Sequence, residues 1–273
     1  MKTKKRKIGI VGCGAIGSGI ARFVEKDLKN HCQLTAFYDI DYTRASRLAK
    51  ELRLKKVCQD SLRGLIQTCD FVVEAVNAEN TGSILREVLK EGKDMMVMSV
   101  GKLLNAEDIF RLAQENHCHL LLPSGAVAGI DALKAASLAG IDKITLTSRK
   151  PPRGFSGNRY LLKKNIDLSK IKKETVLFEG DVDTAVRLFP QNINVAATLA
   201  LASGVKKKIR VCIITSPEYK NNSHEIEAAG PFGRITTRAD NVICPDNPKT
   251  SYLAVLSGMQ TLKQFFSGIC VGT

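Results

Sequence analysis

Three glycines near the start of the chain have the spacing of a turn that binds phosphate groups. They follow the apolar run 7–11 and open the amphipathic segment 18–29. In such a turn the first glycine permits a tight bend, the second lets a pyrophosphate approach the backbone, and the third lets helix and strand pack closely. The N–H groups and the positive dipole of the helix N-terminus attract the phosphates. The sequence therefore predicts a dinucleotide site at Gly12, Gly14, Ala15, Ile16 and Gly17.

An acidic residue follows at the distance that such a site requires. Asp39 lies 22 residues after Gly17, at the end of the expected strand 33–38. Its carboxylate can accept hydrogen bonds from an adenosine ribose, which favours NAD over NADP. Arg44 and Arg47 are nearby cations that would suit a 2′-phosphate. The predicted cofactor is therefore NAD or NADP, with NAD favoured by Asp39.

Two further segments place small or polar residues where a ligand would lie. The first, 122–131, is rich in glycine and alanine and joins a strand end to a helix start, the edge at which ligands of α/β sheets bind. We expect Ala126 and Ala128 to line the nicotinamide and Ser124 to contact substrate, although an interdomain hinge would need the same small residues. Asn194 opens an Ala-rich helix, where a cofactor contact and a plain N-terminal cap are equally consistent with the spacing.

His224 is the candidate proton carrier. Polar residues precede it and Glu225 follows it. A neutral imidazole near pH 7 suits proton transfer, while a structural histidine stays the alternative.

Arg149 and Lys150 are candidates for binding carboxylates. We expect them in a loop at 149–154, because the adjacent prolines at 151 and 152 continue neither a helix nor a central strand. Cationic side chains there would clamp carboxylates, or belong to a solvated surface loop.

Neither histidine nor cysteine spacing indicates a metal site. His117 and His119 have no third ligand nearby, and none of the eight cysteines forms a C-x-x-C pair. We expect no metal, and reduced thiols in a cytoplasmic protein. The basic start leads into the glycine turn rather than a signal peptide, and no apolar run approaches the ~18 residues of a membrane span.

The elements that must position these residues alternate in type through the first part of the chain. We expect strands at 7–11, 33–38, 71–76, 95–99 and 120–122, and helices at 18–29, 43–52, 61–67, 81–90 and 106–115. This rhythm is typical of an α/β fold with a doubly wound parallel sheet of the Rossmann type.

After Pro123 the pattern changes to α+β. We expect strands at 143–148, 209–215, 225–229 and 235–237, and helices at 131–138, 194–203 and 249–266. The predicted domains are a dinucleotide-binding domain at 1–125, a catalytic domain at 126–247 and a C-terminal helix at 248–273 that packs back on the first domain.

The composition is that of a globular protein with excess positive charge. Over 273 residues, 44% are hydrophobic and 25% charged, and 41 Lys and Arg against 27 Asp and Glu give a net charge of +14. Residues 1–125 have a net charge of +5, which equals the charge of the basic cluster at 2–7 alone. Residues 126–247 have a net charge of +7 and residues 248–273 one of +2. The chain has no Trp, and its aromatic content of 5% disfavours a stacking platform for single strands. We expect neither nucleic acid nor membrane as a partner.

Several motifs in order resemble those of L-aspartate dehydrogenases. The motifs are Gly12-Cys-Gly-Ala-Ile-Gly17, Pro123-Ser-Gly-Ala-Val-Ala-Gly-Ile-Asp131, Ser148-Arg-Lys-Pro-Pro152, Phe178-Glu-Gly180, Phe189-Pro-Gln-Asn-Ile-Asn-Val-Ala-Ala-Thr198 and Ser223-His-Glu-Ile226. The first is shared by many nucleotide-binding proteins and the later ones are specific to this family. The one departure is the unusually basic, polar segment 157–173.

The resemblance implies NAD(P)-dependent oxidation of L-aspartate to iminoaspartate, which hydrolyses to oxaloacetate and ammonia or feeds quinolinate and NAD biosynthesis. It implies that His224 is the active-site histidine, and that Ala126 or Ala128, together with Asn194, contacts the cofactor. It also implies that 126–247 carries substrate and dimer contacts in a homodimer, and it leaves coupling to quinolinate synthase open. On this hypothesis aspartate lies between the domains.

Two alternatives share parts of this pattern. A reductase of the dihydrodipicolinate reductase or homoserine dehydrogenase type has the same architecture. A non-catalytic NAD(P)-binding regulator that uses the basic tail on DNA would need a DNA-binding module, and no helix-turn-helix is apparent in the sequence.

Overall fold

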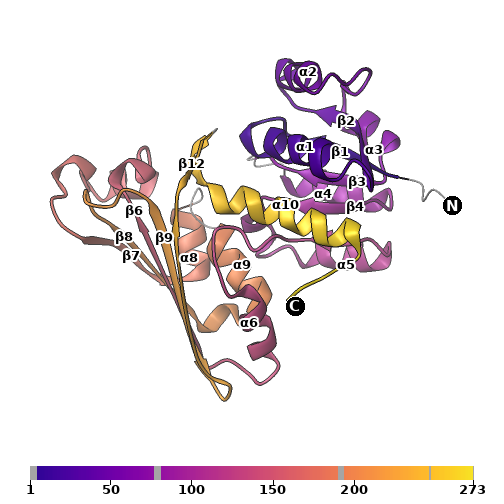
Figure 1. Cartoon of the computed structure of the whole chain (residues 1–273). Helices are drawn as coiled ribbons and strands as arrows, with labels where there is room; N and C mark the ends of the chain where they lie inside the picture. Colours follow the sequence, from indigo (N-terminus) through magenta and orange to yellow (C-terminus); the bar gives the residue numbers. More distant parts are fainter. Residues whose placement is uncertain (1–4, 77–80, 190–193, 246, 273) are drawn as a thin grey trace. The chain divides into compact units, whose positions relative to one another are not determined.

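The computed structural model describes residues 5–76, 81–189, 194–245 and 247–272. Residues 2–4 of the basic cluster and 190–193 of the motif at 189–198 lie outside this part of the chain. The chain forms two compact units, shown in Figure 1. Unit 1 comprises Met1–Pro123 and Val255–Val271, and unit 2 comprises Ser124–Ala254 and Gly272–Thr273.

Five parallel strands form the sheet of unit 1. They are β1 (Arg6–Val11), β2 (Cys32–Tyr38), β3 (Phe71–Glu74), β4 (Asp94–Val97) and β5 (Leu120–Leu121). Their order is β2-β1-β3-β4-β5, and every neighbouring pair is parallel. All four residues of β3 are buried, as expected of a strand covered on both faces. The predicted parallel sheet of the Rossmann type is confirmed.

Five helices connect these strands or lie between them. They are α1 (Ala15–Asp27), α2 (Tyr42–Glu51), α3 (Leu62–Thr68), α4 (Thr81–Lys90) and α5 (Glu107–Glu115), with a 3₁₀ turn, η1 (Val100–Leu103), after β4. Side chains cap α2 and α3, because Asp41 accepts from the Thr43 N–H and Ser61 from the Gly64 N–H. Helix α1 begins after Gly14 with no side-chain cap. Its N-terminus is therefore suited to an anionic ligand.

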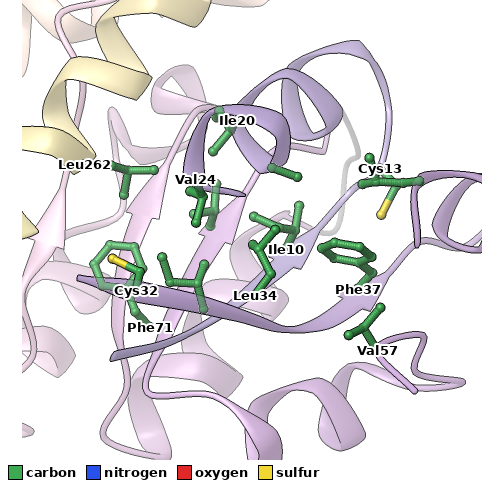
Figure 2. Packing of buried hydrophobic residues seen from close by; sticks show 14 of the residues in the cluster. Ile10, Cys13, Ile20, Val24, Cys32, Leu34, Phe37, Val57, Phe71 and Leu262 are labelled. Atoms are coloured by element: carbon green, nitrogen blue, oxygen red, sulfur yellow. The ribbon is translucent and has the colours of Figure 1, made fainter. Parts of the chain in front are cut away.

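The C-terminal helix contributes to the core of unit 1, as Figure 2 shows for Leu262. This helix is α10 (Tyr252–Ser267). Its Phe265 and Phe266 pack against Phe71 of β3, with ring centroids 5.4 and 5.2 Å away. Side chains from the end of the chain thus complete the packing of its first sheet.

Helix α10 starts later than the sequence predicts. Residues 249–251 belong to strand β12 (Asn247–Ser251), which pairs with β11 (Ile243–Cys244). The prediction rested on the preference for proline in the first turn of a helix. Pro248 instead lies in a two-stranded sheet, where an edge strand tolerates the missing N–H.

The strand order of unit 1 reverses beside β1. The chain passes from β1 to β2 on one side and then to β3 on the other. Ligands of open α/β sheets bind at the carboxyl ends of the strands at such a point. Gly12 follows β1 and Glu74 ends β3 at this point, so the fold places the glycine turn where a dinucleotide binds.

Unit 2 contains a mixed sheet of five strands. They are β6 (Lys143–Lys150), β7 (Thr175–Asp181), β8 (Ile209–Thr215), β9 (Asn222–Gly230) and β10 (Gly233–Asn241). Their order is β10-β9-β6-β8-β7, and only the pair β6–β8 is parallel among these described strands. The predicted α+β character of this part is confirmed.

The two faces of this sheet differ in burial. Alternate residues of β6 are buried while those between them are more exposed. Figure 1 shows α6 (Ile130–Ser137), α8 (Val182–Leu188) and α9 (Asn194–Ser203) alongside the sheet. Helix α9 is apolar and buried along most of its length, so it reads as a core helix. The shorter elements are η2 (Pro152–Phe155), α7 (Arg159–Lys163), η3 (Leu168–Lys170) and η4 (Lys206–Lys208).

Two predictions about unit 2 are wrong in a way that matters for the site. Arg149 and Lys150 do not lie in a loop, because β6 continues to Lys150 and pairs there with Thr215. Pro151 has no N–H to donate to the sheet, so the strand ends at Lys150, but the proline does not remove the strand partners of Arg149 and Lys150 before it. Strand β9 likewise begins at Asn222, which places His224 inside a strand.

Candidate active site

The glycine turn of unit 1 has no room for side chains at its first and third glycines. Gly12 has φ +91°, and a Cβ there would lie 2.7 Å from the Ala75 carbonyl oxygen. A Cβ at Gly17 would lie 1.9 Å from the Gly12 carbonyl oxygen. The turn therefore packs against both its own backbone and the chain after β3, as the motif requires.

The second glycine of the turn meets open space instead. Apart from its two neighbours in the chain, no described residue has an atom within 4 Å of a Cβ built at Gly14. Ala15 and Ile16 follow it at the uncapped start of α1, and both are half-buried. An unfilled space in front of helical N–H groups is what a pyrophosphate needs. These residues therefore fit a dinucleotide.

Asp39 holds the glycine turn to the end of β2. Its Oδ2 accepts from the Cys13 N–H at 2.7 Å and its Oδ1 from the Asp41 N–H at 2.9 Å. Each carboxylate oxygen has a second lone pair, so these bonds leave acceptor capacity for ribose hydroxyls. The structure thus brings Asp39 and the turn together.

Glu74 is a buried carboxyl at the same edge of the sheet, and the sequence analysis did not single it out. It is 0% exposed and contacts the Val76 N–H at 3.0 Å and the Ser99 N–H at 3.1 Å. Ser99 Oγ lies 2.8 Å from Glu74 Oε1 and also contacts the Val76 carbonyl. Since one hydroxyl has one hydrogen for two such neighbours, a proton on Glu74 fits this arrangement. Burial accordingly raises the pKa of Glu74.

We expect Glu74→Gln to change how stability depends on pH. Because folding raises the pKa of Glu74 above its ordinary value of 4.5, this group's contribution to stability is full below 4.5 and is lost as pH rises through the folded pKa. Glutamine does not titrate, so urea unfolding from pH 5 to 9 should show a smaller loss of unfolding free energy in the variant. Parallel profiles would contradict a raised pKa. Glu74→Ala should cost about 2 kcal/mol or more at every pH, because buried donors lose their partner.

The segment after Pro123 is fastened to β10 within unit 2. Asn241 Nδ2 donates to the Ala126 carbonyl at 3.0 Å, and Thr237 Oγ1 donates to the Ala128 carbonyl at 3.0 Å. Ala126 is buried and Ala128 exposed, and Ser124 is half-buried at the start of the segment. These bonds hold the predicted cofactor segment against β10 in one conformation.

His224 lies on the buried face of the sheet of unit 2. It is 3% exposed, and its Nδ1 lies 2.9 Å from Ser148 Oγ. The antiparallel register of β6 and β9 sets Ser148 opposite His224, so both side chains point to one face. If Nδ1–H donates to Ser148, Nε2 keeps a lone pair that can accept a proton.

Lys150 shares this face, two residues beyond Ser148 along β6. It is 8% exposed, and burial lowers its pKa to about 8. Burial first, and then the charge of Lys150, lower the pKa of His224 to about 3. At pH 7 the group therefore consists of a cationic lysine and a neutral histidine.

Arg149 lies outside this group, and Asn194 belongs to another element. Arg149 alternates with Lys150 and so points to the opposite face of β6, where its Nη1 lies 3.1 Å from Glu225 Oε2. Asn194 is the first residue of α9 and is exposed. Among the residues that the structure describes, no cluster of three or more His, Cys, Asp or Glu could hold a metal ion. No helix in the same residues is long and apolar enough to cross a membrane.

Some site residues could have been found from the sequence. Glu74 is a single acid at the end of the apolar run 71–74, and a buried strand with one acid is an unusual pattern. Ser148 and Asn241 have no such signal, since polar residues are common in half-exposed strands.

Family models match both parts of the chain. Residues 131–265 match the model "Aspartate dehydrogenase, C-terminal", and residues 12–123 match "Homoserine dehydrogenase, NAD binding domain". The unit that holds the glycine turn thus resembles an NAD-binding domain, and the segment that holds His224 resembles a domain of aspartate dehydrogenases.

Relatives over the full length agree with these matches. The chain is 43% identical to an L-aspartate dehydrogenase of Methanosarcina barkeri, over 98% of this chain and 99% of that protein. It is 39% identical to that of Methanothermobacter thermautotrophicus, over 97% and 98%. The crystal structure of aspartate dehydrogenase from Thermotoga maritima superposes with a TM-score of 0.74 at 25% identity, covering 98% and 100%. A homoserine dehydrogenase from Thiobacillus denitrificans, at 12% identity and a TM-score of 0.61, shares the fold alone. The resemblance seen in the motifs is confirmed, and the chain belongs to the L-aspartate dehydrogenase family.

Proposed function

We propose that this chain catalyses the NAD(P)-dependent oxidation of L-aspartate to iminoaspartate, in a reaction that can also run in reverse. The observation that carries the proposal is the buried pair of His224 and Lys150, which joins a neutral base to a cation in a chain of this family. Water then replaces the imine nitrogen, which yields oxaloacetate and ammonia.

The cofactor is bound in unit 1. The N–H groups of Ala15 and Ile16 bind the pyrophosphate, the open space at Gly14 admits it, and Asp39 accepts from the adenosine ribose. A bound nicotinamide supplies the acceptor for the hydride that leaves the substrate. Ala126, Ala128 and Asn194 are proposed as further cofactor contacts. These three roles are taken from the family motif. The hydrogen bonds in the structure connect the carbonyls of Ala126 and Ala128 to β10.

His224 is the proposed base. When the substrate loses a hydride from Cα, its ammonium group must lose one proton for the carbon–nitrogen double bond to form. His224 Nε2 accepts that proton, while Ser148 fixes the ring through Nδ1. A neutral imidazole is required for this step, and the low pKa of His224 keeps the unliganded imidazole neutral at physiological pH.

Lys150 is the proposed ligand of a substrate carboxylate. It is cationic at pH 7 and shares the face of His224. Ser124 is proposed as a second contact. Arg149, expected at first to clamp a carboxylate, is paired with Glu225 on the other face and is left out of this site.

The proposal is tested by following the absorbance of reduced nicotinamide with L-aspartate, L-homoserine or no substrate, and NAD or NADP. We expect reduction with L-aspartate only. Folded protein that binds a dinucleotide but reduces it with no substrate would overturn the activity and favour the regulator. Reduction with homoserine in place of aspartate would favour the other enzyme class.

We expect Asp39→Asn to weaken the preference for NAD. The carboxylate of Asp39 repels a 2′-phosphate, and an amide of the same shape does not. The ratio of kcat/KM with NAD to that with NADP should fall about tenfold or more. Asp41→Asn, which removes a half-buried acid two residues away, is the matched control. An equal fall in both variants would show a general effect of charge rather than recognition of the ribose.

Three further parts of the proposal rest on the resemblance: the enzyme is a homodimer, its substrate is a small molecule, and its product is available to a quinolinate synthase. The proposed cytoplasmic location rests on the cysteine pattern. Light scattering of the purified chain tests the dimer, and a monomer with full activity would contradict it.

A further inference from the structure

The buried face of the sheet of unit 2 changes from apolar to polar along its strands. On β6, Ile144 and Leu146 are followed on the same face by Ser148 and Lys150. The register sets Ala228, Ile226 and His224 of β9 opposite the first three, and Ile209, Val211, Ile213 and Thr215 of β8 beside all four. Lys150 and His224 therefore lie at one end of an otherwise apolar surface, where charges interact strongly.

Acidic side chains of the neighbouring strands point away from this end. On β9 and β10 they alternate to the opposite face, where each has an arginine partner: Glu225 with Arg149, Glu227 with Arg234 and Asp240 with Arg238. The residues of β8 on the buried face do not titrate. Among the described residues, Lys150 is the charge that acts on His224.

The spacing of the two groups is short enough for direct coupling. Two residues along a strand span roughly 6.6 Å, and Lys150 lies that far beyond Ser148, which touches the His224 ring. The Lys150 carbonyl also accepts from Thr215 Oγ1 at 2.8 Å, which fixes the end of the strand. Lys150 therefore extends from a fixed strand end on the same face of the sheet as His224.

We propose that a substrate carboxylate binds Lys150 and, by compensating its charge beside His224, turns that buried imidazole into an effective base. The substrate would thus activate the group that deprotonates it. This proposal adds a mechanism of activation to the proposed function, and it rests on that function for the identity of the substrate. In the free protein His224 is too weak a base to hold a proton, since its pKa is about 3. An anion added nearby raises such a pKa by roughly one to three pH units.

The first experiment measures binding of succinate, an unreactive dicarboxylate, to the full chain saturated with NAD. We expect the affinity to fall about tenfold per pH unit above pH 8, as Lys150 loses its proton. Lys150→Met should bind at least about tenfold more weakly and without this pH dependence. Lys150→Arg should bind at high pH as well, because arginine stays charged. Lys143→Met, which removes an exposed lysine at the other end of β6, should behave as the wild type.

The second experiment observes the histidines directly. The chain has four, and His31, His117 and His119 are exposed, so ¹³C-labelled histidine gives one buried signal that His224→Asn assigns. Without succinate, the His224 signal should not titrate between pH 5 and 8. With saturating succinate it should begin to protonate below about pH 6 in the wild type and in Lys143→Met. In Lys150→Met, which lacks the charge that succinate compensates, the signal should be the same with and without succinate.

Two results would overturn the coupling. One is equal succinate binding by the wild type and Lys150→Met; the other is Lys150-dependent binding that leaves the His224 signal unchanged down to pH 5. Both readouts are independent of turnover. If succinate binding to Lys150 changes the titration of His224 but the protein does not oxidise aspartate, the proposed activity is overturned. The coupling between Lys150 and His224 would still be supported.

Discussion

Replacing His224 by asparagine should lower kcat with L-aspartate by about a hundredfold or more, the usual range for loss of a general base. Asparagine is polar and close in shape, so it can keep a hydrogen bond to Ser148. It cannot accept the substrate proton. The measurement is the initial rate of dinucleotide reduction at pH 7 to 8, where His224 is neutral in the wild type.

Binding of NAD should be unchanged in this variant, because the glycine turn and Asp39 belong to unit 1. His31→Asn, at an exposed histidine, is the control and should keep full activity. Near-normal turnover by His224→Asn with intact cofactor binding would rule out the assignment of the base. If thermal unfolding shows that His224→Asn does not fold, His224→Gln replaces it as the test. We expect the same loss of kcat for His224→Gln.

Gly14→Ala and Gly17→Ala should impair the glycine turn for different reasons: the first should lose affinity for NAD, and the second should lose stability. At Gly14 a methyl group enters open space, so the free protein should unfold as the wild type does, while the affinity for NAD should fall about tenfold or more as the methyl group meets the pyrophosphate. At Gly17 the methyl group would lie 1.9 Å from a backbone oxygen, so the variant should lose about 1–3 kcal/mol of stability, or more, before any ligand is added.

Urea unfolding without ligand and calorimetric titration with NAD separate these two effects. Gly19→Ala, further along α1, is the matched control, because its Cβ would make ordinary contacts of 3.5 Å and 3.6 Å. If Gly14→Ala bound NAD as tightly as the wild type, the pyrophosphate would not lie where the motif places it. If Gly17→Ala were as stable as the wild type, α1 would have to shift away from the turn.

Local patterns were enough to predict unit 1. Alternating apolar runs and amphipathic segments predict the strands and helices, and the spacing of Gly12, Gly14 and Gly17 predicts the turn between β1 and α1. These signals work because a buried parallel strand needs continuous apolar residues and a tight turn needs glycine, both within a few residues of sequence. Asp39 follows from the same short-range logic.

Local patterns did not predict the strand ends of unit 2, which depend on pairing between strands that are far apart in the sequence. Proline at 151 suggested a loop for Arg149 and Lys150, but hydrogen bonds to β8 extend β6 through both residues. Whether a residue of a strand faces the core or the solvent depends on the register, and a shift by one residue would exchange Lys150 for Arg149 on the buried face. Local sequence contains no information on that choice.

The division between sequence and structure is clearest in the residues proposed for catalysis. The motifs alone determined the family, the class of cofactor and the importance of His224, because these depend on residue types in a given order. Only the tertiary structure set Ser148 beside His224, 76 positions apart in the chain, buried Lys150 on the same face and buried Glu74 at the end of β3. Burial removes water from these groups and makes their charges act on one another, and no property of the linear chain describes that.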